Sequence, residues 1–166
     1  MTPVLYALIA LALLFDFLNG LHDSSNIVAT MISSRAFRPQ TALGFTAVAH
    51  FIGPFLFGVA VAKTIGSEVV QADVITMEVI FAALVGAILW NVLTWFLGIP
   101  SSSSHALIGG MVGAVIIGAG FEAIKVEGLE KVLIALLASP IIGFVLGFFL
   151  TRVIFFLARA ATPKIN

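Results

Sequence analysis

The feature of this chain that most restricts its fold is a row of oxygen-bearing side chains that follows an apolar segment. The apolar segment runs from Val4 to Phe15. Polar residues then recur at alternating steps of three and four, which predicts one face of a helix; they are Asp16, Asn19, Asp23, Asn26, Thr30 and Ser33. Carboxylates at membrane depth are costly unless they face a partner, a cavity or an ion. The row therefore indicates a pathway for a solute.

Composition supports a membrane location for that row. The chain is 61% hydrophobic and 10% charged, with eight basic and eight acidic residues, too few to cover a soluble domain of this length. Zero net charge argues against a nucleic-acid partner. The absence of cysteine excludes disulfides and thiolate metal sites. No Lys or Arg precedes Arg35, so the N-terminus does not resemble a cleaved signal peptide.

Hydrophobic stretches divide the chain into about five spans near the ~20 residues that a bilayer crossing requires. We expect them at residues 3–34, 41–62, 75–97, 106–121 and 129–157. The first is longer than a bilayer needs, so it must tilt strongly or break, and Asn19–Gly20 is the weak point. Pro54 and Pro140 predict kinks in the second and last spans. The predicted fold class is an all-α integral membrane protein with about five transmembrane spans and broken or re-entrant helices.

Basic residues between the spans predict an orientation. With five spans, five basic residues share one side of the membrane, namely Arg35, Arg38, Arg152, Arg159 and Lys164. Three fall on the other side, namely Lys63, Lys125 and Lys131. Because cytoplasmic loops carry the excess of Lys and Arg, we expect an external N-terminus and a cytoplasmic C-terminus in the plasma membrane.

An odd number of spans makes a following, similar half inverted, which is a common design of secondary transporters. No internal repeat is visible, so we interpret residues 1–166 as one transmembrane domain and one half of an inverted-repeat pair. The partner half would be a second copy, a separate subunit or a missing C-terminal repeat. The ending, residues 162–166, is typical of a cytoplasmic linker cut short.

A second polar constellation follows Pro100, where Ser101, Ser102, Ser103 and Ser104 precede His105. Serine hydroxyls compete for backbone hydrogen bonds inside a helix but suit its start, and Pro100 also favours a helix beginning nearby. Free N–H groups and the positive end of the helix dipole would then point outward together with the hydroxyls. This arrangement predicts a site for an oxyanion such as phosphate.

Each polar feature also has a purely structural interpretation. Asp23 could be hydrogen-bonded to a neighbouring helix, His22 could pack between helices, and the serine run could be a helix cap without a ligand. For His50 and Asn91, interhelical hydrogen bonds are the favoured interpretation. Trp90 and Trp95 are interpreted as lipid-facing or packing surface.

Two motifs resemble those of the inorganic phosphate transporter (PiT) family. The first is Gly20-Leu21-His22-Asp23-Ser24-Ser25-Asn26, similar to the family signature G-x-N/H-D-x-x-N. The second is the stretch GIPSSSSHALIGG at 98–110, similar to the serine/threonine run that ends in His and is followed by glycines. His at position 22 is most like the bacterial low-affinity branch. The resemblance covers essentially the whole chain but only the first of the family's two repeats.

The resemblance implies symport of inorganic phosphate with a cation across the plasma membrane, without enzymatic activity or a cofactor. Asp23 and Asn26 would help hold the coupling cation, with His22 and Asn19 completing the candidate set, and Ser101 to Ser104 would hold phosphate. The coupling cation would be H⁺ or Na⁺, with a divalent metal co-transported as a neutral phosphate complex as a further alternative. No catalytic residue and no definite metal site is expected.

The residues support coupling independently of the family. No Lys or Arg lies in a predicted span before Arg152, and Asp23 adds negative charge near the anion. Phosphate therefore needs an accompanying cation, a protonated Asp23 or a cation from the partner half. Two alternatives stay open. One is a carrier of divalent metals or other cations, bound directly by His22, Asp23 and Asn26. The other is a non-transporting membrane partner or fragment.

Overall fold

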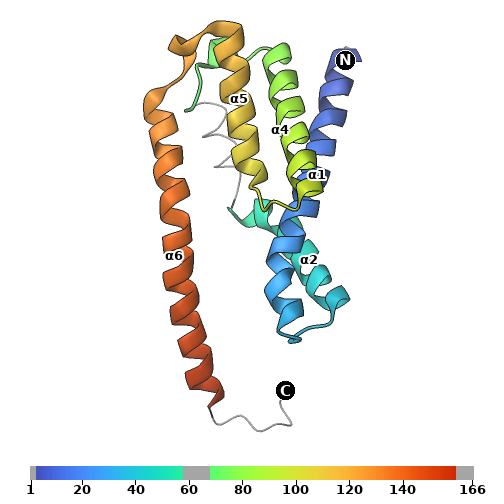
Figure 1. Ribbon diagram of the computed structural model, residues 1–166, viewed down its shortest axis with the longest axis vertical. Coiled ribbons are helices and arrows are strands. Elements are labelled where there is room, and N and C mark those ends of the chain that lie inside the picture. Colours follow the sequence, from blue (N-terminus) through green and yellow to red (C-terminus); the bar gives the residue numbers. More distant parts are fainter. Residues whose placement is uncertain (1–2, 58–67, 160–166) are drawn as a thin grey trace. The chain divides into compact units, whose positions relative to one another are not determined.

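The structure is a computed structural model that describes residues 3–57 and 68–159 (Figure 1). The described residues contain five α-helices and two short 3₁₀-helices. In chain order they are α1 (Pro3–Ser33), α2 (Pro39–Phe57), η1 (Ala72–Val74), α4 (Met77–Leu97), α5 (Ser103–Ala119), η2 (Phe121–Ala123) and α6 (Val126–Ala158). Lys63, Lys164, the end of the second predicted span and the predicted linker lie outside the described residues.

The helices confirm the all-helical prediction and lie close to the five predicted spans. Three of the described helices, α1, α4 and α6, are long and apolar enough to cross a membrane, whereas α5 has only 17 residues. Local chemistry sets the bounds of α4. The Thr76 side chain accepts a hydrogen bond from the Val79 N–H at its start. Gly98 ends it in the left-handed conformation, with φ of 66°, which glycine adopts without strain.

Helix α1 does not break at Asn19–Gly20, so of the two predicted alternatives, a strong tilt or a break, the break is wrong for this element. Its 31 residues form one continuous helix, about 47 Å long at ~1.5 Å per residue. A glycine inside a helix costs only about 1 kcal/mol, which packing of the helix outweighs. The remaining way to fit this length into a bilayer is tilt. Helices α2 and α6 likewise continue through Pro54 and Pro140.

Helices α1, α4 and α5 pack side by side, with α4 in the middle (Figure 1). The colours in Figure 1 show that α1 and α4 run in the same direction and that α5 runs in the opposite direction. Phe15 from α1 packs with Leu84 and Ala87 from α4 in an apolar cluster. Partly buried side chains from all three helices surround them, namely Leu11, Ala12, Ile80, Ile88, Ala106 and Leu107. This cluster fixes the relative positions of the three helices.

The backbones of α4 and α5 approach each other closely at Gly110. A Cβ atom at position 110 would lie 2.5 Å from the carbonyl oxygen of Ala83, and one at Gly86 would lie 3.9 Å from the Gly110 Cα. Small residues allow such contacts between helices in membranes, where tight packing is a main source of association energy. No side chain larger than that of glycine therefore fits at position 110 without a shift of the helices.

Short contacts also join the chain before α4 to the chain after α5. Val70 and Ile124 form an isolated antiparallel bridge. The Gln71 N–H donates to the Ala123 carbonyl at 3.0 Å, and the Lys125 N–H donates to the Val69 carbonyl at 2.9 Å. The α4–α5 hairpin is thus tied at its open end as well as by the tight connection from Gly98 to Ser102.

The remaining helices have different surroundings. Helix α2 packs on α1. Helix α6 lies in a second compact unit that begins at Glu127, and Gly128 is its only buried residue among those described. Near its C-terminal end, the guanidinium of Arg152 lies 5.1 Å from the Phe148 ring centroid, and that of Arg159 lies 4.3 Å from the Phe156 centroid.

Substituting Gly110 tests the close approach. We expect Gly110→Ala to destabilise the protein by about 1–3 kcal/mol, because the added methyl group meets the backbone of α4. The measurement is the melting temperature of the purified protein in detergent. Gly113→Ala is the matched control, since a Cβ there has nothing within 4 Å. An equal melting temperature for the two variants would contradict the observed packing.

Candidate functional site

The acidic residues of α1 line an open pocket between α1 and α2. The pocket has a volume of about 610 Å³. Asp16, Asn19 and Asp23 contribute from α1, and Thr46 and His50 contribute from α2. Gly20, Ser24, Leu43, Ala47 and Pro54 complete the lining. Two carboxylates from α1, with the His50 imidazole from α2, favour a cation over an anion here.

A second, smaller pocket of about 200 Å³ lies between α1 and the end of α4. His22 and Asn26 line it from one side and Thr94 and Pro100 from the other. Ser25, Trp95, Gly98 and Ile99 complete the lining. The Ser25 hydroxyl donates to the His22 carbonyl at 2.7 Å, so its proton is already used within the helix. The second pocket therefore connects the first motif with the segment that leads into the serine run.

The sequence predicted that the polar row of α1 forms one face of the helix. The structure instead divides it between two surfaces. Asp16, Asn19 and Asp23 line the α1–α2 pocket, whereas Asn26 lines the pocket beside α4. Helix geometry explains the difference. Each residue rotates the helix by ~100°, so the ten steps from Asp16 to Asn26 rotate it about 80° less than three full turns. The row therefore winds around α1 and serves two surfaces.

The serine run starts a helix, as predicted. Ser102 is the N-cap residue of α5, and its side chain accepts a hydrogen bond from the His105 N–H at 3.4 Å. Ser103 begins the helix and is 1% exposed, while Ser104 is exposed. The first turn of α5 thus presents backbone N–H groups and the positive end of the helix dipole.

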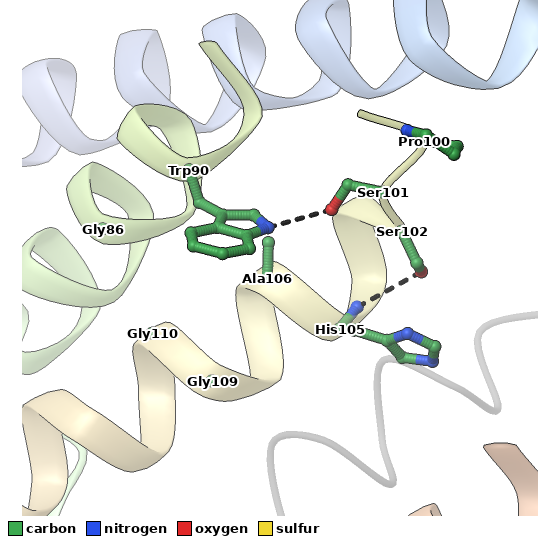
Figure 2. Close-up of a pocket in the computed structure, with 9 residues that line it drawn as sticks. All are labelled: Gly86, Trp90, Pro100, Ser101, Ser102, His105, Ala106, Gly109 and Gly110. Atoms are coloured by element: carbon green, nitrogen blue, oxygen red, sulfur yellow. Dashed lines mark hydrogen bonds between the residues drawn. The ribbon is translucent and has the colours of Figure 1, made fainter. Parts of the chain in front are cut away.

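The Ser101 hydroxyl points toward Trp90, whereas the Ser102 hydroxyl points toward the backbone of His105 (Figure 2). The Ser101 hydroxyl accepts a hydrogen bond from the Trp90 indole N–H at 2.9 Å. Both serines border a third pocket of about 560 Å³ on the α4–α5 pair. Trp90, Pro100, His105, Gly86, Ala106, Gly109 and Gly110 complete its lining. Trp90 holds the connection between the two helices in place, so interpreting it only as lipid-facing or packing surface was incomplete.

Five buried side-chain atoms lack a hydrogen-bond partner in the described part of the chain. They are Asn19 Oδ1, His22 Nε2, Asn91 Oδ1, Asn91 Nδ2 and Ser103 Oγ. His22 is 6% exposed, and its Nδ1 lies 3.2 Å from the Leu18 carbonyl oxygen. Because a carbonyl only accepts, Nδ1 is the donor in this contact. Asn91 is 0% exposed. The expected interhelical hydrogen bond of Asn91 is not present.

The predicted site residues do not share one pocket but are mostly distributed over the three pockets described above. Asp23 and Asn19 line the α1–α2 pocket, and His22 and Asn26 line the α1–α4 pocket. Ser101 and Ser102 line the α4–α5 pocket, Ser103 is buried, and Ser104 lines none of these three pockets. The hydrogen bond of Trp90 could have been expected from the sequence, since an indole N–H in an apolar region requires an acceptor.

Proteins of similar sequence are transporters. The chain is 51% identical to a protein of Rhizobium meliloti (strain 1021) over 161 residues, which are 97% of this chain and 48% of that protein. It is 50% identical to a protein of Bacillus subtilis (strain 168) over 147 residues, covering 86% of this chain and 43% of that protein. Both are described as "Probable low-affinity inorganic phosphate transporter". The chain spans about half the length of these relatives.

The pattern of the Phosphate transporter family matches residues 19–165. The chain belongs to this family. Its relatives are named as transporters and not as enzymes, and phosphate is the substrate of the family. Together with the apolar helices, this membership fits a membrane protein.

A solved structure has the same fold. It is described as "The sodium-dependent phosphate transporter", and it matches this member of the phosphate transporter family with a TM-score of 0.83. The match covers 93% of this chain and 40% of that chain, at 24% sequence identity. At this identity the similarity establishes the fold alone.

Cysteine labelling tests the burial of Ser103. The chain contains no natural cysteine, so one introduced thiol can be followed without background. We expect Ser103→Cys to react at least tenfold more slowly than Ser104→Cys with a water-soluble maleimide, because thiolate formation requires contact with water. Labelling is compared in the native protein in detergent and after denaturation. Equal native rates would show that the first turn of α5 is not packed as described.

Proposed function

We propose that this chain forms one half of a secondary transporter that moves inorganic phosphate with a cation across the plasma membrane. The observation that carries the proposal is the serine-rich start of α5, where Ser102 caps the helix next to open pockets. Helices α1, α2, α4 and α5 contain no Lys or Arg. An oxyanion at this helix start therefore meets backbone N–H groups and hydroxyls, which bind phosphate without a fixed positive charge.

The same charge pattern supports co-transport of a cation. A helix dipole supplies only about half an elementary charge, which does not neutralise phosphate. Asp16 and Asp23 bring further negative charge into the α1–α2 pocket. Two negative groups in a region of low dielectric repel each other strongly unless a cation or a proton accompanies them. We assign Asp23, with Asn19, Asn26 and His22, to the cation and Ser101 to Ser104 to phosphate.

The length of the relatives supports the half-transporter. The chain aligns with about half of the Rhizobium meliloti and Bacillus subtilis proteins, and with 40% of the sodium-dependent structural neighbour. A partner half, from a second copy, another subunit or a continuation of the chain, would complete the cavity between two inverted repeats. The basic residues after α1 place the N-terminus outside in this proposal. Proton and sodium are the two coupling cations to be distinguished.

Direct metal transport is the weaker alternative. It requires His22, Asp23 and Asn26 to coordinate the transported metal ion directly, without phosphate. The described residues contain no group of three or more His, Cys, Asp or Glu side chains arranged to hold a metal ion. The α1–α2 pocket instead combines the carboxylates of Asp16 and Asp23 with the neutral oxygen atoms of Asn19 and Thr46.

Phosphate uptake tests the proposal. The chain is expressed in bacterial cells that lack their own phosphate uptake, alone and together with the remaining half of the Rhizobium meliloti relative. We expect uptake of radiolabelled phosphate that arsenate blocks by competition, and that falls on removal of either sodium or the proton gradient. Metal uptake that arsenate does not affect would favour the cation carrier. No uptake in either combination would favour a non-transporting membrane protein.

Neutralising Asp23 tests the assignment of the cation. We expect Asp23→Asn to lower coupled phosphate uptake by at least tenfold while membrane insertion stays intact, because the cation loses its charged ligand. Asp73→Asn is the matched control, since Asp73 lies in the short helix η1 and is exposed. Uptake by Asp23→Asn equal to that of the control would remove Asp23 from the coupling site.

A further inference from the structure

Trp90 bonds to the serine run although it belongs to neither of the two motifs. Its indole N–H, on α4, donates to the Ser101 hydroxyl at 2.9 Å, and both residues line the pocket of about 560 Å³ (Figure 2). The side chain of Trp90 is 51% exposed, so it forms a wall of this pocket and not part of the packed core. A residue in this place can influence what Ser101 binds.

The hydrogen bond from Trp90 holds the middle of the connection between α4 and α5. Ser101 lies in this connection, outside both helices. The start of the connection is fixed to α4, because the Ile99 N–H donates to the Thr94 carbonyl at 2.9 Å. Its end is fixed by Ser102, which caps α5. Between these two points, the indole holds the Ser101 side chain.

The direction of this hydrogen bond determines what Ser101 can offer to a ligand. An indole N–H only donates, so Ser101 Oγ is the acceptor, and the bond leaves the hydroxyl proton unused. Ser102 is in the same state, because its oxygen accepts from the His105 N–H at 3.4 Å. Both serines border the same pocket. Their oxygen atoms are held by N–H groups of the protein, and their two protons are available to an anion.

The other two serines of the run have different surroundings. Ser103 is 1% exposed, and Ser104 lines none of the three pockets described above. Within the run, the pocket is therefore bordered by the two hydroxyl groups whose oxygen atoms are already held.

We propose that Trp90 is a positioning residue for phosphate binding, and that its indole N–H fixes the Ser101 oxygen so that the Ser101 proton is directed at the anion. This role rests on the proposed function, because phosphate is there assigned to Ser101 to Ser104. A hydroxyl group without a fixed partner rotates freely, and ordering it when the ligand binds costs affinity. Trp90 acts through Ser101, since its own N–H is already used in this bond.

Two substitutions at position 90 separate positioning from packing. Trp90→Phe keeps a bulky ring but has no N–H, whereas Trp90→His is smaller and keeps a ring N–H at the place of the indole N–H. We expect Trp90→Phe to raise the apparent KM for phosphate about three- to tenfold, the usual effect of one neutral hydrogen bond, while the maximal rate changes less than about twofold. Trp90→His should stay within about twofold of the natural KM.

Uptake is measured in the cells described above, together with the remaining half of the Rhizobium meliloti relative. All variants are compared at about pH 8, where an exposed imidazole is neutral. KM does not depend on the amount of inserted protein, so a partial loss of insertion leaves the comparison valid. A purely structural role predicts the opposite order, with a natural KM for Trp90→Phe, which is closer in size to the indole. An unchanged KM in Trp90→Phe, or an equal rise in both variants, would overturn the assignment of Trp90.

A double-mutant cycle with Ser101→Ala shows whether Trp90 acts through Ser101. We expect Ser101→Ala to raise KM about tenfold or more, as for a lost hydrogen bond to a charged ligand. Adding Trp90→Phe should then raise KM by less than about twofold further, because the hydroxyl group through which it acts is absent. Full additivity would overturn the role of Trp90 while leaving the proposed function intact. If the unsubstituted chain takes up no phosphate, the proposed function fails, and the role of Trp90 fails with it.

Discussion

The close approach of α4 and α5 is the contact on which the arrangement of the site depends. Because the Gly110 backbone meets the Ala83 carbonyl, the two helices have little freedom to slide along each other. Their register then places Trp90 beside Ser101. The bridge between Val70 and Ile124 closes the opposite end of this hairpin. A contact made only of glycine and backbone thus determines where hydroxyl groups and helix-end N–H groups are presented.

Much of the fold could be predicted because membrane helices follow simple constraints of length and polarity. The apolar stretches lie close to the observed helices, and the start of α5 follows from serines after Pro100. These predictions rest on local chemistry, such as the capping of a helix by a hydroxyl group. The sequence left open whether the first span tilts or breaks at Asn19–Gly20. It continues as one helix, because the weak local preference of glycine is outweighed by packing against α4.

Most of the candidate site residues line pockets, but their grouping could not be predicted from the sequence. The row from Asp16 to Ser33 has a mean spacing slightly below the helical repeat, so it winds around α1 and divides between two pockets. The hydrogen bond between Trp90 and Ser101 joins α4 to the segment that leads into α5. Such pairings are properties of packing, which residue spacing within one helix does not determine.

The shortness of α5 has a consequence for the membrane around it. Its 17 residues extend about 26 Å, less than a typical hydrocarbon thickness of ~30 Å. If the C-terminal end of α5 lies at one membrane–water interface, the turn from Pro100 to Ser102 lies below the opposite membrane–water interface. Irregular backbone at that depth is tolerated only where protein or water covers it. Bilayer thickness would then set how deep this turn lies, so that lipids with longer acyl chains would lengthen the route from the aqueous phase to the serines.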